Sequence, residues 1–267
     1  MLIAQISDMH IKPPGELLYK RIDTAGYLER AVAHVKVLDP KPDIVLATGD
    51  LVDGGKVEEY ELLRRLLAPL DMPVYLIPGN HDARDPMRQV FADHAYLPRA
   101  GFLQYTIEGW PVRLIALDTL EPGKTHGELC AERLDWLEAR LAESNRPTIL
   151  FLHHPPFECG IKPFDGHRLL EGEQRLTELV RRHDHVERAL CGHVHRPIQV
   201  RWAGTMACVA PSTAHQATLD LHDEAPFSMM MEPPGVALHL WRSGTGLITH
   251  TSYIGNYEGP RPFRPDP

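Results

Sequence analysis

Short apolar runs alternate with stretches of helical periodicity along most of the chain. The apolar runs predict buried strands at residues 2–7, 43–48, 74–77, 112–118, 148–152 and 188–191. Between them, apolar side chains recur three or four positions apart, which predicts helices around Leu28, Leu63 and Leu137 and over residues 169–182. A strand that is apolar throughout is covered on both faces, so this alternation is typical of parallel strands joined by crossover helices.

The last part of the chain follows a different pattern. Three further apolar runs, at residues 206–211, 236–241 and 247–253, have little helical periodicity between them, which predicts a second sheet packed on the first. The predicted fold class is α/β, a layered α/β/β/α sandwich of two packed mixed sheets with outer helices. Residues 215–234 lack a clear period and are expected to form a loop or cap, and the proline-rich residues 259–267 are expected to be extended or frayed.

Composition and charge narrow the class of protein. With 267 residues, 43% hydrophobic and 24% charged, the chain suits one large globular domain, or a domain with an appendage. The net charge of -8 argues against a long nucleic acid as partner, but not against a small anion in a locally positive cleft. The chain begins without a leader-like segment and contains no run of about 20 apolar residues, so we expect no membrane association and a cytoplasmic location.

Polar side chains directly follow five of the predicted strands. They are Asp8 and His10 in SDMH, Asp50 in TGD, Asn80 and His81 in GNHD, His153 and His154 in HHPP, and His193 and His195 in CGHVH. Open α/β sheets gather ligands at the carboxyl ends of their strands, so these groups are expected to converge although they are far apart in sequence. Glycine or proline beside most of them permits the sharp turns that direct side chains inward.

The chemistry of this set indicates a metal centre. Carboxylate, imidazole and amide groups suit Mn, Fe, Zn or Co, and the histidines argue against a pure Mg or Ca site. Their number exceeds what one ion needs and fits two divalent ions, which a carboxylate can bridge. The four cysteines form no CxxC pair, so we expect reduced thiols and no thiolate zinc site. Each element alone is weak, since a single histidine at a strand end is usually a surface residue, but five in this order favour a ligand role.

The motifs DMH, GD, GNHD, HHPP and GHVH, in that order, resemble those of the calcineurin-like metallophosphoesterases. Within that superfamily, the segments YLIPGNHD, FLHHPP and CGHVH are similar in sequence to those of the bacterial glycerophosphodiesterase and class III cyclic-nucleotide phosphodiesterase branch. The likeness covers nearly the whole chain. The resemblance implies a catalytic core over residues 1–215. It also implies that residues 216–267 continue the same domain as a cap or loop segment and C-terminal strands, with possible oligomer contacts.

The resemblance also implies roles for single residues. One metal would be held by Asp8, His10, Asp50 and His195, and a second by Asp50, Asn80, His153 and His193. Asp50 would bridge the two ions, and His81, Asp50 and His215 would be the catalytic residues, with the two histidines facing the substrate. His154 would lie behind the ligands, or would replace His153 if the register of HHPP is shifted by one. Purple acid phosphatases carry a tyrosine three residues after the GD aspartate, and Asp53 stands there, so no tyrosinate–iron centre is expected.

The implied activity is hydrolysis of small phosphodiesters, either glycerophosphodiesters or 3′,5′-cyclic nucleotides. A metal-bound hydroxide would attack phosphorus, while the two ions stabilise the developing charge. A phosphomonoesterase, a protein phosphatase or a nuclease on the same metals is the alternative, although the chain has no basic stripe for a long polyanion. A metal-binding scaffold without activity is less favoured, because every expected ligand position is filled. The resemblance further implies a homodimer or larger homo-oligomer, to which the run Met229, Met230 and Met231 can contribute an adaptable contact.

Overall fold

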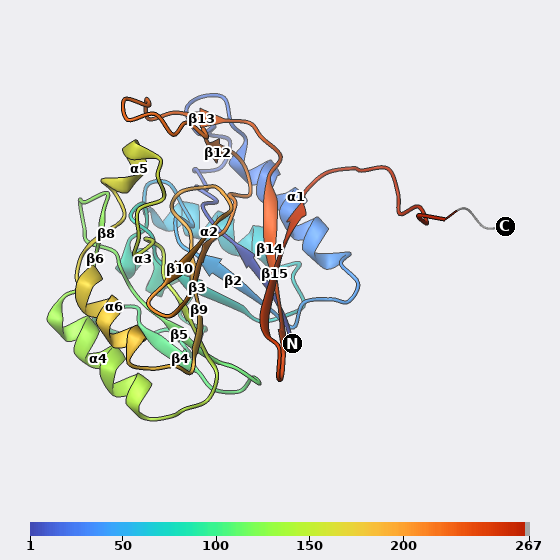
Figure 1. Cartoon of the computed structure of the whole chain (residues 1–267). Coiled ribbons are helices and arrows are strands. Elements are labelled where there is room, and N and C mark those ends of the chain that lie inside the picture. The colour runs from blue at the N-terminus through green and yellow to red at the C-terminus, as the bar shows by residue number, and fades with distance from the viewer. Residues whose placement is uncertain (265–267) are drawn as a thin grey trace.

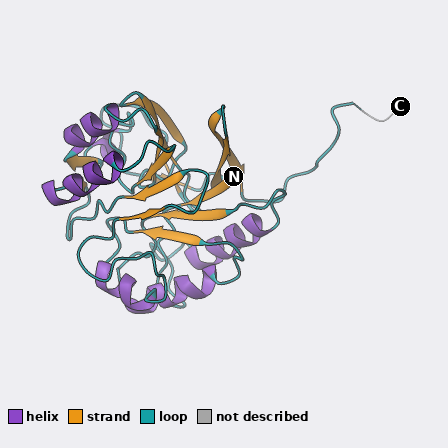
Figure 2. Cartoon of the chain, turned by 90° about the horizontal axis from the view of Figure 1, so that it is seen from below, coloured by secondary structure: helices purple, strands orange, loops and turns teal. Residues whose placement is uncertain are grey.

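Two β-sheets pack face to face between two groups of helices (Figure 1). This arrangement is seen in a computed structural model, which describes residues 1–264. Viewed from below, helices lie on both outer sides and strands lie between them (Figure 2). The predicted α/β/β/α sandwich of two mixed sheets is therefore confirmed.

The first sheet has five strands. In spatial order they are β15 (Gly246–Tyr253), β14 (Gly235–Arg242), β1 (Leu2–Ile6), β2 (Ile44–Thr48) and β3 (Val74–Ile77). Strands β1, β2 and β3 are parallel, as the crossover pattern predicted, whereas β14 and β15 form an antiparallel hairpin that pairs with β1. The end of the chain thus lies beside its beginning in the first sheet. The prediction that residues 236–241 and 247–253 belong to a second sheet is therefore wrong, because β14 pairs with the free edge of β1.

The second sheet has six strands. In spatial order they are β10 (Ile198–Trp202), β11 (Thr205–Val209), β9 (Val186–Cys191), β7 (Thr148–Phe151), β5 (Arg113–Ala116) and β4 (Tyr105–Ile107). The four central strands are parallel and the two edge strands are antiparallel. Two short strand pairs lie outside the main sheets, namely β6 (Gly127–Glu128) with β8 (Leu169–Glu171) and β12 (Gln216–Ala217) with β13 (Met229–Met230).

The helices cover the outer faces because each has one apolar face. They are α1 (Thr24–Lys36), α2 (Val57–Leu67) and α3 (Arg84–Val90) on the first sheet, α4 (Ala131–Ala142) and α6 (Glu173–Arg181) on the second, and the short α5 (Lys162–Asp165). In α1 the side chain of Asp23 caps the helix by accepting a hydrogen bond from the Gly26 amide at 2.9 Å. The face bearing Leu28, Val32 and Val35 is buried, as its spacing predicted.

Strands β5 and β7 of the second sheet are largely apolar because both of their faces are covered. Leu114 of β5 contributes to the apolar cluster shared between the sheets, whereas its neighbour Ile115 contributes to the cluster beneath α4 and α6. Phe151 and Leu150 of β7 divide in the same way. Successive side chains of a strand point to opposite faces, so a continuous apolar run is what two cores require.

Some predicted boundaries are wrong. The helix expected over residues 169–182 is a strand, β8, followed by α6, and the two are separated by Gly172 at φ 83°. Leu129 lies so close to Gly172 that a Cβ there would overlap its carbonyl oxygen, so the break depends on a tertiary contact. The cap segment after His215 is mostly irregular, with only the short β12–β13 pair. Of the tail, residues 259–264 carry no helix or strand, and residues 265–267 lie outside the described residues.

Within residues 1–264, no helix is both long and apolar enough to cross a lipid bilayer.

The hairpin of β14 and β15 buries a polar side chain. His239 of β14 is fully buried and lies between Gln5 Oε1 at 3.0 Å and Thr249 Oγ1 at 2.9 Å. Burial lowers the pKa of His239 to about 3, so the folded protein keeps this imidazole neutral.

The pH dependence of the free energy of unfolding should reflect the protonation of His239. In the unfolded chain an imidazole titrates near its ordinary pKa of about 6.5, while in the folded state His239 takes up a proton only near pH 3. Stability is therefore lost as the pH falls from 6.5 toward 3, at up to about 1.4 kcal/mol per pH unit from this group. Urea unfolding of the chelator-treated protein and of His239→Gln should give a shallower slope for the variant. Equal slopes would contradict this account.

Candidate metal centre

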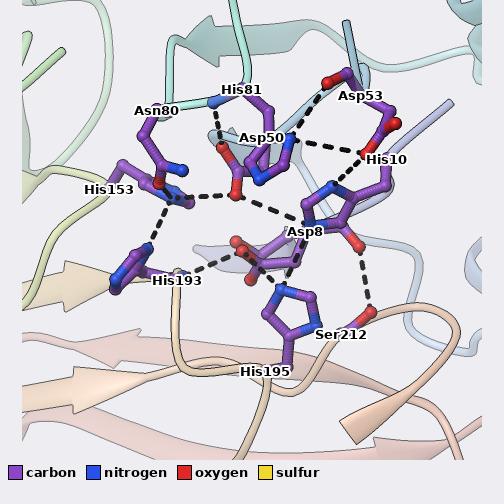
Figure 3. Close-up of polar contacts among 12 residues, drawn as sticks. Asp8, His10, Asp50, Asp53, Asn80, His81, His153, His193, His195 and Ser212 are labelled. Atoms are coloured by element: carbon purple, nitrogen blue, oxygen red, sulfur yellow. Dashed lines mark hydrogen bonds and ion pairs between the residues drawn. The ribbon is translucent and has the colours of Figure 1, made fainter. Parts of the chain in front are cut away.

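The predicted polar residues meet at the carboxyl ends of both sheets (Figure 3). The first sheet contributes side chains that follow β1, β2 and β3, and the second contributes those that follow β7 and β9. They form one cluster of side chains, Asp8, His10, Asp50, Asn80, His81, His153, His193 and His195. The sandwich thus joins, in one place, groups that come from distant parts of the sequence.

Four donors form a first group around His10. The Nε2 atom of His10 lies 3.1 Å from His195 Nε2 and 3.5 Å from Asp50 Oδ2. His195 Nε2 is also 3.4 Å from Asp8 Oδ1. All four side chains are buried, and their donor atoms lie within 4.8 Å of one another.

A second group forms around His153. Its Nε2 atom lies 3.3 Å from each of three donors, which are Asp50 Oδ2, Asn80 Oδ1 and His193 Nδ1. The same oxygen, Asp50 Oδ2, therefore belongs to both groups.

The spacing of these atoms fits metal ligands better than hydrogen bonds. Ligands bound at 2.0–2.2 Å to one ion are about 3.0–3.6 Å apart in tetrahedral or octahedral geometry, and the donor pairs are 3.1–3.5 Å apart. Facing imidazole nitrogens make poor hydrogen-bond partners when both have lone pairs. Asp8 Oδ2 is also buried without a hydrogen-bond partner. Such uncompensated polar atoms are costly unless a cation binds there, so the residues fit two metal ions.

Hydrogen bonds on the far side of the rings orient the imidazoles. His153 donates from Nδ1 to the carbonyl oxygen of Thr48 at 2.8 Å, which leaves the Nε2 lone pair facing Asp50. His195 likewise donates from Nδ1 to the carbonyl oxygen of His215 at 3.3 Å. A partner on the second nitrogen fixes the tautomer of a metal-binding histidine and raises its basicity.

The backbone around the site is strained. Within residues 1–264, eight non-glycine residues have positive φ, and five of them belong to the donor groups, namely Asp8 (55°), His10 (43°), Asp50 (46°), His193 (73°) and His195 (53°). A left-handed conformation costs about 1–2 kcal/mol for a residue with a Cβ. Strain of this kind persists where the surrounding structure enforces it, and it concentrates at functional sites.

Two glycines allow the backbone to approach the donors. A Cβ on Gly79 would overlap Asp50 Oδ1 and the Asp50 amide and would lie 2.8 Å from His153 Cδ2. A Cβ on Gly192 would overlap Ser7 Oγ and lie 2.7 Å from the carbonyl oxygen of Thr48. Both positions therefore require glycine for close approach rather than for flexibility.

The buried carboxylates differ in their pKa values. Burial raises the pKa of Asp8 to about 6. Burial alone would also raise the pKa of Asp50, but the nearby imidazoles of His153 and His81 outweigh it and hold this pKa well below its ordinary value. Asp50 Oδ1 further accepts a hydrogen bond from the His81 amide at 2.9 Å. Asp50 is thus held as an anion at the centre of the cluster.

The two predicted substrate-facing histidines line the open cavity above the donors. His81 donates from Nδ1 to the carbonyl oxygen of Asp53 at 3.0 Å, and its ring stands edge-on to His10. Burial alone would lower the pKa of His81, but Asp50 and Asp53 outweigh it and raise the pKa to about 10. His215 lies 4.6 Å from His195 between ring centres, and burial lowers its pKa to about 2, so it is neutral.

His154 lies beside the second group, and one of its ring nitrogens is within 4.8 Å of ring nitrogens of His153 and His193. Its Nδ1 atom lies 2.8 Å from Thr119 Oγ1, and its ring lies 4.7 Å from that of His193. Unlike His153, it has no donor pair at 3.3 Å with Asp50 or Asn80.

Asp82 follows His81 in the GNHD motif, where an aspartate can either form the turn or orient a histidine. It accepts hydrogen bonds from the Leu51 and Gly79 amides and so supports the turn.

Several residues of the site carry no signal in the sequence. Asp53 stands out there only as a departure from tyrosine, yet it contacts His10, His81 and Lys12. The cavity has a volume of about 690 Å³ and is lined by further side chains, among them Tyr19, Arg21, Thr125, Phe164, His167, Phe227 and Met229. None of these belongs to a motif, so no local pattern joins them to the cluster.

The family model for calcineurin-like phosphoesterases matches residues 1–197. The chain belongs to the calcineurin-like phosphoesterase family. This confirms the resemblance based on the five motifs, and it accounts for the donor groups, since members of this family use a dinuclear centre of divalent metals. The identity of the metals does not follow from family membership.

One relative matches nearly all of the chain, and another matches most of it. A probable glycerophosphodiester phosphodiesterase of Arcobacter nitrofigilis is 42% identical over 264 residues, which is 98% of this chain and 97% of that protein. A 3′,5′-cyclic adenosine monophosphate phosphodiesterase of Escherichia coli K12 is 30% identical over 215 residues, which is 80% of this chain and 76% of that protein. The chain is thus similar to phosphodiesterases of both kinds that its motifs resemble.

Solved structures support the fold. A dimetal phosphatase from Danio rerio superposes with a TM-score of 0.68 at 15% identity, covering 96% of this chain and 99% of that one. A purple acid phosphatase from Lupinus luteus superposes with a TM-score of 0.63 at 15% identity, covering 90% of this chain and 49% of that one. At this identity the likeness concerns the fold alone.

Replacing Gly79 by alanine should impair metal binding. The added methyl group would push Asp50 and His153 away from each other, and both donor groups share Asp50. We expect Gly79→Ala to retain less than about one tenth of the bound metal of the wild type, as judged by elemental analysis after reloading with Mn or Zn.

Gly109→Ala is the matched control, because a Cβ at Gly109 meets no atom within 4 Å. It should bind metal like the wild type, and circular dichroism should show that both variants are folded. Full metal content in Gly79→Ala would contradict the role given to this close approach.

Proposed function

We propose that this protein is a metal-dependent phosphodiesterase that hydrolyses small phosphodiesters at a dinuclear centre. The observation that carries this proposal is the position of Asp50 Oδ2, 3.5 Å from His10 Nε2 and 3.3 Å from His153 Nε2. One carboxylate oxygen shared by two donor groups suits a bridging ligand between two ions. The similarity to a glycerophosphodiester phosphodiesterase and to a cyclic adenosine monophosphate phosphodiesterase supports a diester as substrate.

The proposed ligands follow the two donor groups. The first ion is held by Asp8, His10, Asp50 and His195, and the second by Asp50, Asn80, His153 and His193. The amide oxygen of Asn80 adds no negative charge, so the centre keeps a small positive charge that suits the single negative charge of a diester. His154 supports His193 from behind and is not a ligand. The divalent ions are Mn, Fe, Zn or Co, which this set of nitrogen and oxygen donors accepts.

When bound, two divalent ions lower the pKa of a coordinated water and stabilise negative charge on the phosphoryl group. The side chains around them position the substrate. His81 has its Nδ1 hydrogen bonded to the carbonyl oxygen of Asp53, so its Nε2 faces the cavity. With a raised pKa, His81 can hold a phosphoryl oxygen or give a proton to the leaving oxygen from Nε2. Neutral His215 can accept or donate a hydrogen bond to the same group.

The alternative is a phosphomonoesterase or nuclease that uses the same ions. Phosphomonoesters carry about two negative charges at neutral pH, which suits a more positive site than this one. Within diesterases, the choice between a glycerophosphodiester and a 3′,5′-cyclic nucleotide depends on the cavity wall. Two segments contribute to that wall, one with Phe164 and one with Phe227 and Met229, and both are outside the motifs.

The remaining expectations concern the whole chain. We propose that residues 216–267 continue the domain of residues 1–215, which is supported by the pairing of β14 with β1. A homodimer or larger homo-oligomer is supported by apolar side chains that are exposed in the cap segment, namely Leu219, Leu221, Phe227, Met230 and Met231. The expected cytoplasmic location stays a prediction, as does the absence of a membrane or long nucleic acid partner.

The first test is substrate and metal dependence. The chelator-treated protein is reloaded with Mn, Zn, Fe or Co and assayed with bis- and mono-(p-nitrophenyl) phosphate, glycerophosphocholine and cyclic AMP. We expect turnover that requires metal and favours the diester, because the site suits one negative charge. A monoester preference would assign a phosphatase instead, and two bound metals without turnover of any ester would favour a scaffold.

The second test separates the bridge from the substrate-facing group. Asp50→Ala removes a donor from both groups and should nearly abolish both metal content and turnover. His81→Ala should keep its metal and lose about 10²–10⁴-fold in kcat, the range for general acid catalysis. His250→Ala, an exposed histidine on β15, is the control and should behave like the wild type. Full metal content and rate in Asp50→Ala would exclude the proposed centre.

A further inference from the structure

A strained turn forms one side of the cavity mouth. Leu18 and Ile22 are bridged by two backbone hydrogen bonds of 2.9 Å, and the Arg21 amide donates to the carbonyl oxygen of Leu18 at 3.1 Å. Between them Tyr19 and Lys20 both adopt left-handed conformations, with φ of 50° and 59°. Two such residues in a row without glycine are unusual, so the surrounding structure must enforce this turn.

The turn is anchored beside the donor groups. Leu18 and Ile22 are buried in a small apolar cluster with Ala214, the residue before His215. The ring of Tyr19 lies 6.1 Å from that of His215. Tyr19 and Arg21 both line the cavity, so the turn fixes an arginine at the mouth of the site.

Arg21 has a distinct place among the charges of this wall. It is the only lysine or arginine among the lining side chains, and the only carboxylate there is Asp50, which lies between the two donor groups. Arg21 is exposed, and no carboxylate of residues 1–264 forms an ion pair with its guanidinium. The cavity therefore offers a free cation to a ligand, and offers no free carboxylate to a quaternary ammonium or amine.

The opposite wall is apolar. The rings of Phe164 and Phe227 are 4.8 Å apart, and Phe164 lies 6.4 Å from His193. Tyr19, which precedes Arg21 in the turn, lies beside His215, and His215 lies beside His10. Phe164 instead lies beside His193. The two arms of a bound diester would therefore meet walls of different chemistry.

We propose that Arg21 is a specificity-determining residue that binds a second anionic group, a carboxylate or a phosphate, on one arm of the substrate. This inference rests on the proposed phosphodiesterase function and names its substrate class. A guanidinium forms paired, charge-assisted hydrogen bonds with either group, and such bonds are about twice as strong as those between neutral partners. Diesters with a second negative charge are therefore preferred over those with a cationic or neutral arm.

Two pairs of substrates test this preference, because the members of each pair differ by one anionic group. In the first pair, glycerophosphoserine carries a carboxylate that glycerophosphoethanolamine lacks. In the second pair, glycerophosphoglycerol phosphate carries a terminal phosphate that glycerophosphoglycerol lacks. In at least one pair the Mn-loaded wild type should favour the anionic member in kcat/KM. Arg21→Ala should lower kcat/KM for that member by about 10–100-fold, mainly through KM, and change its partner by less than about threefold.

One control variant keeps a positive charge at residue 21, and the other removes the positive charge of the neighbouring residue. Arg21→Lys retains a cation and should recover part of the loss, and Lys20→Ala removes a neighbouring charge that does not line the cavity and should have no effect. Turnover of bis(p-nitrophenyl) phosphate, which has no second anionic group, should fall far less in Arg21→Ala than turnover of the anionic substrates does. It also tests the proposed function separately, because failure of the wild type on this diester would exclude the activity itself.

Binding provides a readout that does not depend on turnover. Calorimetric titration of the Mn-loaded protein with phosphoserine and phosphoethanolamine should give tighter binding of phosphoserine, and Arg21→Ala should remove the difference. The same comparison applies to glycerol bisphosphate and glycerol phosphate. Equal loss on both members of each pair, or no loss in either assay, would overturn the inference and leave Arg21 as a surface residue.

Discussion

The structure depends on keeping one carboxylate ionised inside the protein. Asp50 is almost fully buried, and a buried charge costs several kcal/mol unless opposite charges and hydrogen bonds surround it. Imidazoles from both sheets and the His81 amide provide that surrounding. The two sheets can place these groups around one carboxylate only if their carboxyl ends lie together. These side chains can therefore assemble into one site only when the two sheets pack against each other.

This requirement explains why the site departs from ordinary local structure. His10 and Asp50 adopt left-handed conformations that a residue with a Cβ normally avoids, and Gly79 and Gly192 leave no room for a Cβ at all. The strain is sustained by the apolar core, in which the strands are covered on both faces. A chain with a smaller core would have less free energy available to hold such a backbone, since folded domains are only marginally stable.

Around this centre, connections without a sequence motif form the wall of the cavity. The wall of the cavity comes from the turn at residues 18–22, from α5 and from the segment between β12 and β13. Such connections tolerate change in sequence, while the strands that end in metal donors do not. Arg21 and Phe227 both lie on this wall, and we propose that side chains of this kind select among diester substrates.

The layered fold and the members of the donor cluster could be predicted from the sequence. Short apolar runs are recognisable as strands, and polar residues that follow a parallel strand lie at a known edge of the sheet. Asp8, Asn80 and His195 are therefore recognisable from their positions along the chain alone. Which atoms meet depends instead on how the two sheets and the loops pack together. The strand at residues 169–171, the contact of Asp53 with His10 and the place of Arg21 each depend on partners that are distant in sequence or on a turn without a motif. Local patterns carry no record of such contacts, because those contacts arise only when separate elements pack together.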